Sequence, residues 1–381
     1  MPTRDALELF TPFFVDLTDP RVDRTKRHAL LDIIILAVCA TLGNADGWVD
    51  IECFANAKIE FFRSFLSLPN GVPSHDTFGR VFARLDPAAL MACIQQWLDA
   101  LATTVAGEVI AIDGKTLRGS FDTATGKNPL HLVSAWACQA RLTLGQVAVE
   151  AKSNEITAIP LLLELLDLQG CIVTIDAMGC QKEIAAAIRS RDADYVLAVK
   201  DNQPSLHETI HQAFMAHAEE DFTDPGLRHL KTVERGHGRD EIREYTIAPA
   251  PQALRDGAWK DVRSIGMVCR SRTRMVTGDE TDEVVYYLSS LPPKVKQFAK
   301  AVRGHWGIEN RLHWCLDVIF TEDHSRVRKD HSPLNLSMLR RLALAILRKD
   351  TSLKNSLRGK RLRAGWDEEV LRNLLTSFSR N

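Results

Sequence analysis

The chain has 381 residues and a formal net charge of −1 at pH 7, with 45% hydrophobic and 25% charged residues. This composition is typical of a globular protein that folds in water, and the length allows two or three domains. The longest apolar run, Ile33 to Leu42, is too short to cross a bilayer, and no signal-peptide pattern opens the chain. The eight cysteines form no CxxC pair, which favours reduced thiols in a cytoplasmic protein and argues against a cysteine zinc site.

The near-zero net charge hides a basic block near the C-terminus. Residues 294–363 carry 17 Lys and Arg against 6 Asp and Glu, a net charge of +11. Such a block in a neutral protein favours a nucleic-acid partner, although a solvated helical face is the plainer alternative. The clustered cations are Arg326, Arg328, Lys329, Arg340, Arg341, Arg358, Lys360, Arg361 and Arg363.

The first part of the chain, residues 1–105, is predicted to be helical. The expected helices cover Ala29–Leu42, Trp48–Phe65, a short segment from Pro73 to Arg84, and Asp86 to about Thr104. The short helix carries Arg80 and Arg84, so it can enter a DNA groove as in a helix-turn-helix or simply pack in a helical bundle. Both readings stay open, because this region is net acidic.

At Glu108 the pattern changes to that of a sheet. Two apolar runs, Val109–Ile112 and Cys171–Ile175, are typical of strands buried on both faces, and each is followed by an aspartate. Residues 131–138 and 143–150 predict a hairpin, 156–167 and 181–191 predict helices, and 194–200 predicts a further strand. A helix near 205–219 and segments with strand character follow. We therefore expect an α/β protein with a ribonuclease-H-like core.

The predicted domain plan follows from this order of elements. A helical N-terminal domain occupies 1–105, the first part of the ribonuclease-H-like core 106–204, and a β-rich insertion 205–291. The last catalytic helix and the end of the core occupy 292–350, and a basic tail occupies 351–381.

The helix after Pro293 carries an acidic residue in an unusual place. Apolar residues recur there at three-to-four spacing, namely Val295, Phe298, Val302, Trp306, Leu312 and Leu316. Glu309 falls on the same stripe, so we expect it to point inward. A buried carboxylate costs several kcal/mol unless it is paired, protonated or bound to a metal.

Asp113 and Asp176, which end the two buried strands, are the expected partners of Glu309. Neighbouring strands that end together place both carboxylates at one edge of the sheet. Three carboxylates raise each other's pKa, and Mg²⁺ or Mn²⁺, in one or two ions, removes that cost. Two ions can support in-line displacement at phosphorus. One isolated Asp after a strand is more often a cap, but two such endings and one buried Glu form an improbable coincidence.

A rival site lies within the helix itself. His305, Glu309 and His313 are spaced i, i+4, i+8 and can in principle hold a transition metal. No HExxH pattern is present, and this reading leaves both aspartates unexplained. We prefer the histidines as DNA-backbone contacts or as hydrogen-bond partners that hold Glu309.

At these residues the sequence strongly resembles the bacterial insertion-sequence DDE transposases of the ISAs family, the group of the H-repeat-associated proteins. The matching stretches are Asp19-Pro20-Arg21, Arg27-His28, Pro69-Asn70-Gly71, Ser74–Phe78, Ala111–Ser120, Lys152–Thr157, Thr174–Gln181, Gly236–Arg239 and His305–Asn310. The resemblance implies that Asp113, Asp176 and Glu309 are the DDE triad and bind Mg²⁺. It also implies a protein of the bacterial cytoplasm and nucleoid that acts as a dimer on terminal inverted repeats of double-stranded DNA, cutting the ends and joining the 3′-hydroxyl to target DNA.

One departure concerns phosphate binding. The wider superfamily carries a tyrosine, an arginine and a lysine around its last glutamate, where this chain has Val302, His305 and Leu316. The roles of the missing cations therefore do not transfer. Other residues are then our candidates for DNA contacts. They are Lys115, Arg118, Lys200, His237, Arg239, Arg303, His305, Arg311, Arg326, Arg328 and Lys329. Lys115 and Lys200 can equally be ordinary surface lysines, and His237 and Arg239 can lie on a solvated strand face.

Two other functions remain compatible with the sequence. One is a metal-dependent nuclease of the same fold that cuts DNA without joining it. The other is a catalytically silent DNA-binding relative.

Overall fold

A computed structural model of the chain describes residues 10–101, 107–123, 126–149, 153–219, 226–236 and 238–376. His237, one of the predicted DNA contacts, lies outside these ranges. None of the helices in these ranges has the length and apolar character needed to cross a membrane.

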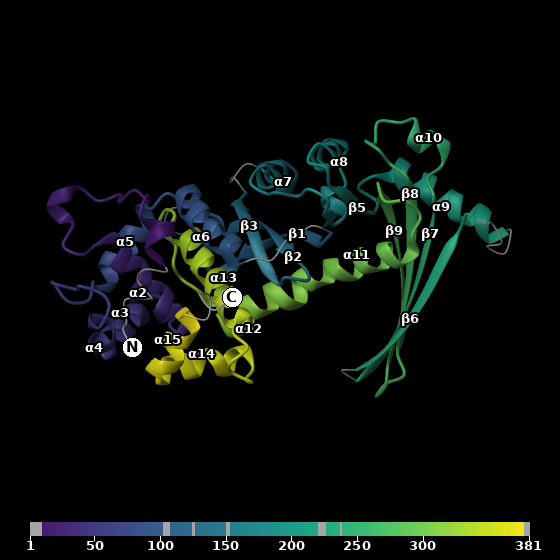
Figure 1. Cartoon of the computed structure of the whole chain (residues 1–381). Coiled ribbons are helices and arrows are strands. Elements are labelled where there is room, and N and C mark those ends of the chain that lie inside the picture. The colour runs from purple at the N-terminus through teal and green to yellow at the C-terminus, as the bar shows by residue number, and fades with distance from the viewer. Residues whose placement is uncertain are drawn as a thin grey trace.

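The N-terminal part is a cluster of helices, as predicted (Figure 1). Its elements are η1 (Asp23–Thr25), α2 (Leu30–Leu42), α3 (Trp48–Ala57), α4 (Ile59–Arg63), α5 (His75–Arg84) and α6 (Pro87–Leu101). The single helix expected over Trp48–Phe65 is broken at Lys58, whose backbone leaves the helical region. Helix α5 buries Phe78, Val81 and Phe82 and packs on α3, while Arg80 and Arg84 stay exposed.

The centre of the molecule is a nine-stranded sheet with the order β3-β2-β1-β4-β5-β9-β8-β7-β6. The first five strands are β1 (Val109–Leu117), β2 (Leu130–Ala137), β3 (Leu142–Ala148), β4 (Ile172–Ile175) and β5 (Asp194–Val199). β1, β4 and β5 run parallel, whereas β2 and β3 form an antiparallel hairpin on β1. With α7 (Glu155–Glu164) and α8 (Lys182–Arg189) as crossovers, this is the ribonuclease-H-like arrangement that the sequence predicted.

The predicted β-rich insertion continues this sheet rather than forming one of its own. After α9 (Pro204–Glu219) come β6 (Arg228–Gly236), β7 (Arg239–Pro249), α10 (Gln252–Arg255), β8 (Ser264–Arg274) and β9 (Glu280–Ser289). β9 pairs antiparallel with β5 from Val196↔Ser289 to Val199↔Tyr286. Figure 1 shows these four strands projecting from the body as a long ribbon. We refer to β6–β9 as the sheet extension.

Helices cover both faces of the core sheet. Ile110 and Ile112 of β1 pack against α7 and α8 on one face. On the other face, Val109 packs with Phe298 and Val302 of α11 (Val295–Gly307), which crosses β1, β4 and the sheet extension. The alternation of side chains along β1 therefore places odd-numbered residues toward α11.

The helical rod that begins with α11 continues as a π-helix, η4 (Ile308–His313), and ends as α12 (Trp314–Ile319). The N–H of Trp314 donates to the carbonyl of Glu309, which is the i to i+5 bond of a π-helix. After η5 (Glu322–His324), α13 (Ser332–Lys349) returns through the molecule and packs on α2. The last helices, α14 (Leu357–Trp366) and α15 (Glu368–Thr376), lie beside the N-terminal helices (Figure 1).

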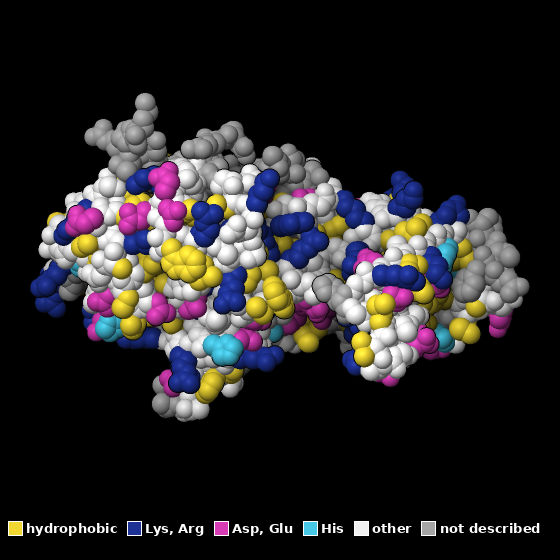
Figure 2. Space-filling model, turned by 90° about the horizontal axis from the view of Figure 1, so that it is seen from below, with side chains coloured by type: hydrophobic (Ala, Val, Ile, Leu, Met, Phe, Trp, Pro, Cys, Tyr) yellow, Lys and Arg dark blue, Asp and Glu magenta, His cyan; other side chains and the backbone are white. Residues whose placement is uncertain are grey.

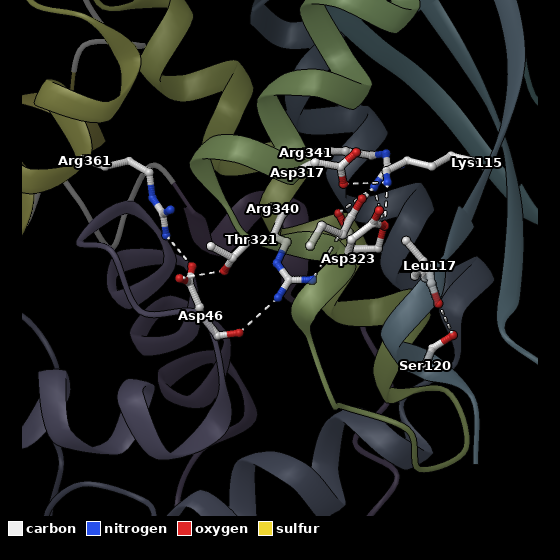
Figure 3. A network of polar contacts seen from close by, with 12 residues as sticks. Asp46, Lys115, Leu117, Ser120, Asp317, Thr321, Asp323, Arg340, Arg341 and Arg361 are labelled. Atoms are coloured by element: carbon white, nitrogen blue, oxygen red, sulfur yellow. Dashed lines mark hydrogen bonds and ion pairs between the residues drawn. The ribbon is translucent and has the colours of Figure 1, made fainter. Parts of the chain in front are cut away.

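The basic block is not the continuous DNA-binding surface that its sequence predicted. Arg340, Arg341, Lys360 and Arg361 are buried, with Arg361 fully inaccessible to solvent. Arg361 donates to Asp46 Oδ1 at 3.0 Å (Figure 3). It also donates to the carbonyl of Thr41 at 3.2 Å and stacks over the ring of Phe320. Arg340 and Arg361 bind groups of the segment between α2 and α3, whereas Arg341 binds Glu322 and Lys360 binds Asp350, contacts that charge counting alone cannot reveal.

On the face seen in Figure 2, Lys and Arg side chains are spread among acidic and apolar ones rather than gathered in one patch.

Candidate active site

The register between β1 and β4 brings Asp113 and Asp176 to the same edge. Ile112 pairs with Ile175, so each aspartate follows the last paired residue of its strand. The prediction that both strands end there is right for β4 only. β1 continues to Leu117 because it keeps pairing with β2, where Asp113 lies opposite Ser134.

Asp176 is held in place by backbone donors. Its Oδ1 accepts from the N–H groups of Met178 and Gly179, at 3.1 and 3.4 Å, and so caps the short helix η3 (Ala177–Gly179). Asp176 also lines a cavity together with Lys200 and Glu309. Residues from the end of β4, the end of β5 and the π-helix therefore meet in one place.

Glu309 is exposed, so the expectation that it points into the core was wrong. The buried positions of this segment are Ile308 and Leu312. The buried residues Ala301, Ile308, Leu312 and Cys315 keep helical spacing through this segment, and Glu309 lies beside that stripe, whereas the prediction placed Glu309 on it. Glu309 thus faces the cavity that it shares with Asp176 rather than the core. We call Asp113, Asp176 and Glu309 the acidic site.

The electrostatics of the acidic site show that its carboxylates act on one another. Burial, followed by the negative charges of Asp176, Glu155 and Glu309, raises the pKa of Asp113 to about 7. Burial and the charge of Glu155 also raise the pKa of Asp176, against the lowering effect of its backbone donors and of Lys200. Negative charge is therefore concentrated here without sufficient neutralisation by the protein.

The two histidines of the rival site point to different partners. His305 Nδ1 lies 3.1 Å from Thr174 Oγ1 on β4, and burial lowers the His305 pKa to about 4. His313 Nδ1 lies 3.5 Å from Asp113 Oδ2, and burial lowers the His313 pKa to about 3. His305 is half-buried and lines the cavity of Asp176 and Glu309, so its contact with DNA stays a prediction, and the polar contacts of the two histidines go to Thr174 and Asp113 rather than to Glu309.

The acidic site fits a hard divalent cation by the type and charge of its donors. It offers carboxylate oxygens, which Mg²⁺ and Mn²⁺ prefer, and the raised pKa of Asp113 reflects charge that such an ion would compensate. Within the described ranges, no three His, Cys, Asp or Glu side chains already stand at metal-binding spacing. The acidic site thus offers the donor atoms that suit such an ion, although its side chains are not at coordination distance from one common point.

Comparison with known proteins decides the family. Residues 106–346 match the family described as Transposase DDE domain, and residues 11–98 match the DDE_Tnp_1-associated family. The chain belongs to the DDE transposase family. It is 37% identical to the "H repeat-associated putative transposase YhhI" of Escherichia coli K12, over 94% of this chain and 95% of the relative. It is 38% identical to the "Putative transposase YncI" of Escherichia coli O157:H7, over 95% and 93%.

Among solved structures, the piggyBac transposase synaptic complex with hairpin DNA aligns with a TM-score of 0.40 at 11% identity, covering 99% of this chain and 78% of that one. The strand order of the sheet is what identifies the ribonuclease-H-like core.

In this transposase, Lys115 is neither a surface residue nor open to DNA. It is buried, and its Nζ lies 2.6 Å from Asp317 and 3.0 Å from Asp323 (Figure 3). Both partners lie on the segment that follows Glu309. Lys115 therefore connects β1 to the end of the helical rod, which sequence spacing could not show.

The other predicted DNA contacts that the structure describes are exposed except Arg328, and some of them are held in ion pairs. Lys200, Arg311, Arg326 and Lys329 are exposed, and Arg118 is exposed but its Nε lies 3.4 Å from Asp323 Oδ2. Arg303 is bound to Glu234, at 2.6 Å, and Arg239 lies 3.7 Å from Glu241, both on the sheet extension. Arg328 donates to the carbonyl of Gly119 and covers the ring of Phe121. The exposed residues remain our candidates for DNA binding.

Two features of the site were missed from the sequence. Trp306 is covered by Arg270 of the sheet extension, with the guanidinium 4.3 Å from the ring centroid, so the extension touches the rod next to Glu309. Glu155 lies close enough to Asp113 and Asp176 to shift both pKa values upward. Glu155 stands in one of the family-like stretches, Lys152–Thr157, which was the one available signal.

Proposed function

We propose that this protein cuts double-stranded DNA at the ends of a mobile element and joins the freed 3′-hydroxyl to target DNA, using Asp113, Asp176 and Glu309. One observation carries the proposal. Carboxylates from β1, from the end of β4 and from the π-helix converge, and burial together with the charges of Asp176 and Glu309 raises the pKa of half-buried Asp113 to about 7. Nothing in folding requires such a concentration of negative charge, which is unfavourable unless a cation joins it.

Each member of the acidic site has a separate task in this proposal. Asp176 is fixed by the N–H groups of Met178 and Gly179, so its free oxygen is oriented. Asp113 lies next to His313, and the pairing of β1 with β2 fixes its backbone. Glu309 is exposed on the π-helix and is the member best placed to meet substrate. Mg²⁺ bound by these three residues, with Mn²⁺ as a substitute and two ions as the full complement, supplies Lewis-acid stabilisation of the attacking and leaving oxygens at phosphorus.

The exposed cations near the acidic site suit the DNA backbone. Lys200 follows β5 at the cavity that holds Asp176 and Glu309, and Arg311 is exposed on the π-helix itself. Contacts of this kind position DNA without reading its sequence. We propose terminal inverted repeats as the DNA that is bound, and a homodimer that holds two ends together.

The test is a cleavage and strand-transfer assay on labelled DNA from the flanks of the gene. We expect metal-dependent cutting of the 3′ end and joining into a target plasmid, abolished by EDTA and by Glu309→Gln, while Glu309→Gln still binds DNA. Cutting without joined products would instead indicate a nuclease, and binding without cutting in the wild type would indicate a silent relative. If Glu309→Gln still cuts DNA, Glu309 is not a catalytic residue.

A further inference from the structure

The sheet extension changes from apolar to charged along the face that points to α11. Tyr245 of β7 packs edge-on against Phe298 of α11, with the ring centroids 6.4 Å apart. Beyond Tyr245, alternate residues of β7 and the β8 residues opposite them carry charges on this same face. They are Arg239, Glu241 and Arg243 on β7 and Arg270 and Arg272 on β8. Arg243 lies directly opposite Arg270, and because like charges at opposed positions destabilise a sheet, strand pairing does not explain this cluster.

This charged face lines a cavity between the sheet extension and the helical rod, which we call the arginine cavity. Its volume of about 760 Å³ lies within the range of sites that bind small ligands. Five arginines line it against two glutamates, Glu234 and Glu241, which leaves a net charge of +3. An anion is therefore the ligand that suits the cavity.

One buried glutamate does not satisfy the arginines that surround it. Glu241 is 4% exposed, and its carboxylate lies 2.6 Å from Arg243, 3.1 Å from Arg272 and 3.7 Å from Arg239. Burial acts to raise the pKa of Glu241, but these three arginines hold the pKa below its ordinary value. A carboxylate has only two oxygens, whereas three guanidinium groups together offer about fifteen N–H donors. Most of these donors are thus left for water or a ligand.

Arg243 carries a buried donor that lacks an acceptor. Its side chain is 7% exposed, and its Nη1 lies 3.2 Å from Glu234 but without the geometry of a hydrogen bond. No other acceptor among the described residues hydrogen-bonds this nitrogen, and such a buried donor costs free energy. Because Arg243 lines the arginine cavity, an anion bound there supplies the acceptor.

The arginine cavity adjoins the acidic site. Trp306 lines the arginine cavity and also the cavity that Asp176 and Glu309 share. Asn310, which directly follows Glu309 on the π-helix, lines the arginine cavity as well. Arg272 covers Trp306, with its guanidinium 5.6 Å from the ring centroid. A polyanion that reaches Glu309 therefore lies beside these arginines.

We propose that the arginine cavity binds a phosphodiester group of the DNA strand that enters the acidic site. This inference rests on the part of the proposed function that makes DNA the substrate. The planar guanidinium fork matches two phosphate oxygens at once, and Arg239, Arg243 and Arg272 are the binding residues. The site is assembled before DNA arrives, because Glu241 already holds these arginines on one face of the sheet extension.

The test replaces single phosphates of the DNA by neutral methylphosphonates. Labelled duplexes from the flanks of the gene each carry one methylphosphonate, moved along both strands, and fluorescence anisotropy with EDTA present measures their affinity for the full chain. We expect several positions to weaken wild-type binding. At one or two adjacent positions, a loss of about tenfold should disappear in Arg272→Gln, because that charge-assisted contact is already gone.

The variants separate a phosphate contact from a general effect of charge. Arg272→Gln should weaken binding of unmodified DNA about tenfold and reduce the salt slope by about one. Arg272→Lys keeps the charge without the fork, so it should keep the slope but still bind more weakly. Arg239→Gln tests the same positions at an exposed residue, where the fold is at less risk. Arg255→Gln, exposed on α10, removes the same charge outside the cavity and should respond to every methylphosphonate as wild type does.

The outcomes separate this inference from the proposed function. If no methylphosphonate position loses its effect in Arg272→Gln or Arg239→Gln while wild type cuts and joins DNA, the inference fails and the proposed function stands. If calorimetry finds inorganic pyrophosphate bound by wild type and not by Arg272→Gln, with no coupled position on DNA, the ligand is a free phosphate and the inference also fails. A coupled position in a protein that never cuts DNA would support the cavity assignment and overturn the proposed cutting.

Discussion

Lys115 Nζ lies 2.6 Å from Asp317 Oδ1, and this ion pair links the strand that carries Asp113 to the helical rod that carries Glu309 (Figure 3). Asp323 adds a second carboxylate at 3.0 Å, and Lys115 itself is buried. Two members of the acidic site therefore stand on elements that one buried lysine holds together. Lys115 therefore fixes the position of the rod relative to β1.

Lys115→Met should destabilise the fold, since it leaves Asp317 and Asp323 partly buried without their cation. Breaking a buried ion pair on one side typically costs about 3–5 kcal/mol. Urea denaturation measures the loss, and Lys296→Met, at an exposed position of α11, is the control. The double variant Lys115→Met/Asp317→Leu should recover part of the stability. A stable Lys115→Met protein whose DNA affinity falls would show instead that Lys115 contacts phosphate.

Arg361 and Arg358 lie on the same helix, α14, and give a matched comparison of buried and exposed cations. Arg361 binds Thr41 and Asp46 at the junction with the N-terminal helices, whereas Arg358 is exposed. Arg361→Met should lower the free energy of unfolding by several kcal/mol because it leaves buried hydrogen-bond acceptors without a donor. Arg358→Met should lower the free energy of unfolding by well under about 1 kcal/mol. Equal changes in the denaturation midpoint would contradict the structural role of the buried block.

Sequence patterns predicted the core well because hydrophobic periodicity is a local property. The strand order around Asp113 and Asp176 followed from two apolar runs and the spacing of the helices between them. The orientation of Glu309 was missed because Glu309 lies at the margin of the apolar stripe, next to Ile308, where spacing alone does not decide which residue is buried. The burial of Arg361 was missed because its partners, Thr41 and Asp46, lie far away in the sequence, and charge counts carry no information about contacts.

The lowered pKa of His305 predicts how the free energy of unfolding changes with pH. Its ordinary pKa is 6.5, and burial lowers the value to about 4. Between these values the unfolded chain binds a proton that the folded chain does not, so stability falls as pH drops from about 6.5 to 4 and is constant above 7. The full effect is on the order of 3 kcal/mol. His305→Gln should make this decline shallower in denaturation curves, although His313 contributes in the same direction. His324→Gln, at an exposed position, should leave the decline unchanged.

The raised pKa of Asp113 predicts the opposite change of stability with pH, and it also predicts how the effect of Mg²⁺ on stability depends on pH. Its pKa is raised from 3.8 to about 7, so the folded chain retains a proton that the unfolded chain has lost, and this group reduces stability as pH rises through that range. A divalent cation replaces the proton. Mg²⁺ should therefore raise the melting temperature more at about pH 8 than at about pH 6. Asp113→Asn should abolish the difference, and an equal Mg²⁺ effect at both pH values would place the ion elsewhere.

Arg311 and Arg303 test which cations take the place of the missing arginine and lysine. Arg311 is exposed on the π-helix, while Arg303 is bound to Glu234 of the sheet extension. Arg311→Ala should weaken binding to labelled element ends and reduce the salt slope by about one, as expected for one lost phosphate contact. Arg303→Ala should change the slope less, because DNA must first displace Glu234.

Fluorescence anisotropy over a range of salt concentrations measures both slopes. A slope change for Arg303→Ala as large as that for Arg311→Ala would mean that the ion pair with Glu234 opens on DNA, and Glu234→Gln should then tighten binding. If neither variant alters the affinity or the slope, both arginines are ruled out. The exposed cations beyond Phe320, Arg326 and Lys329, would then be the residues to change, because they lie exposed in the segment between η5 and α13.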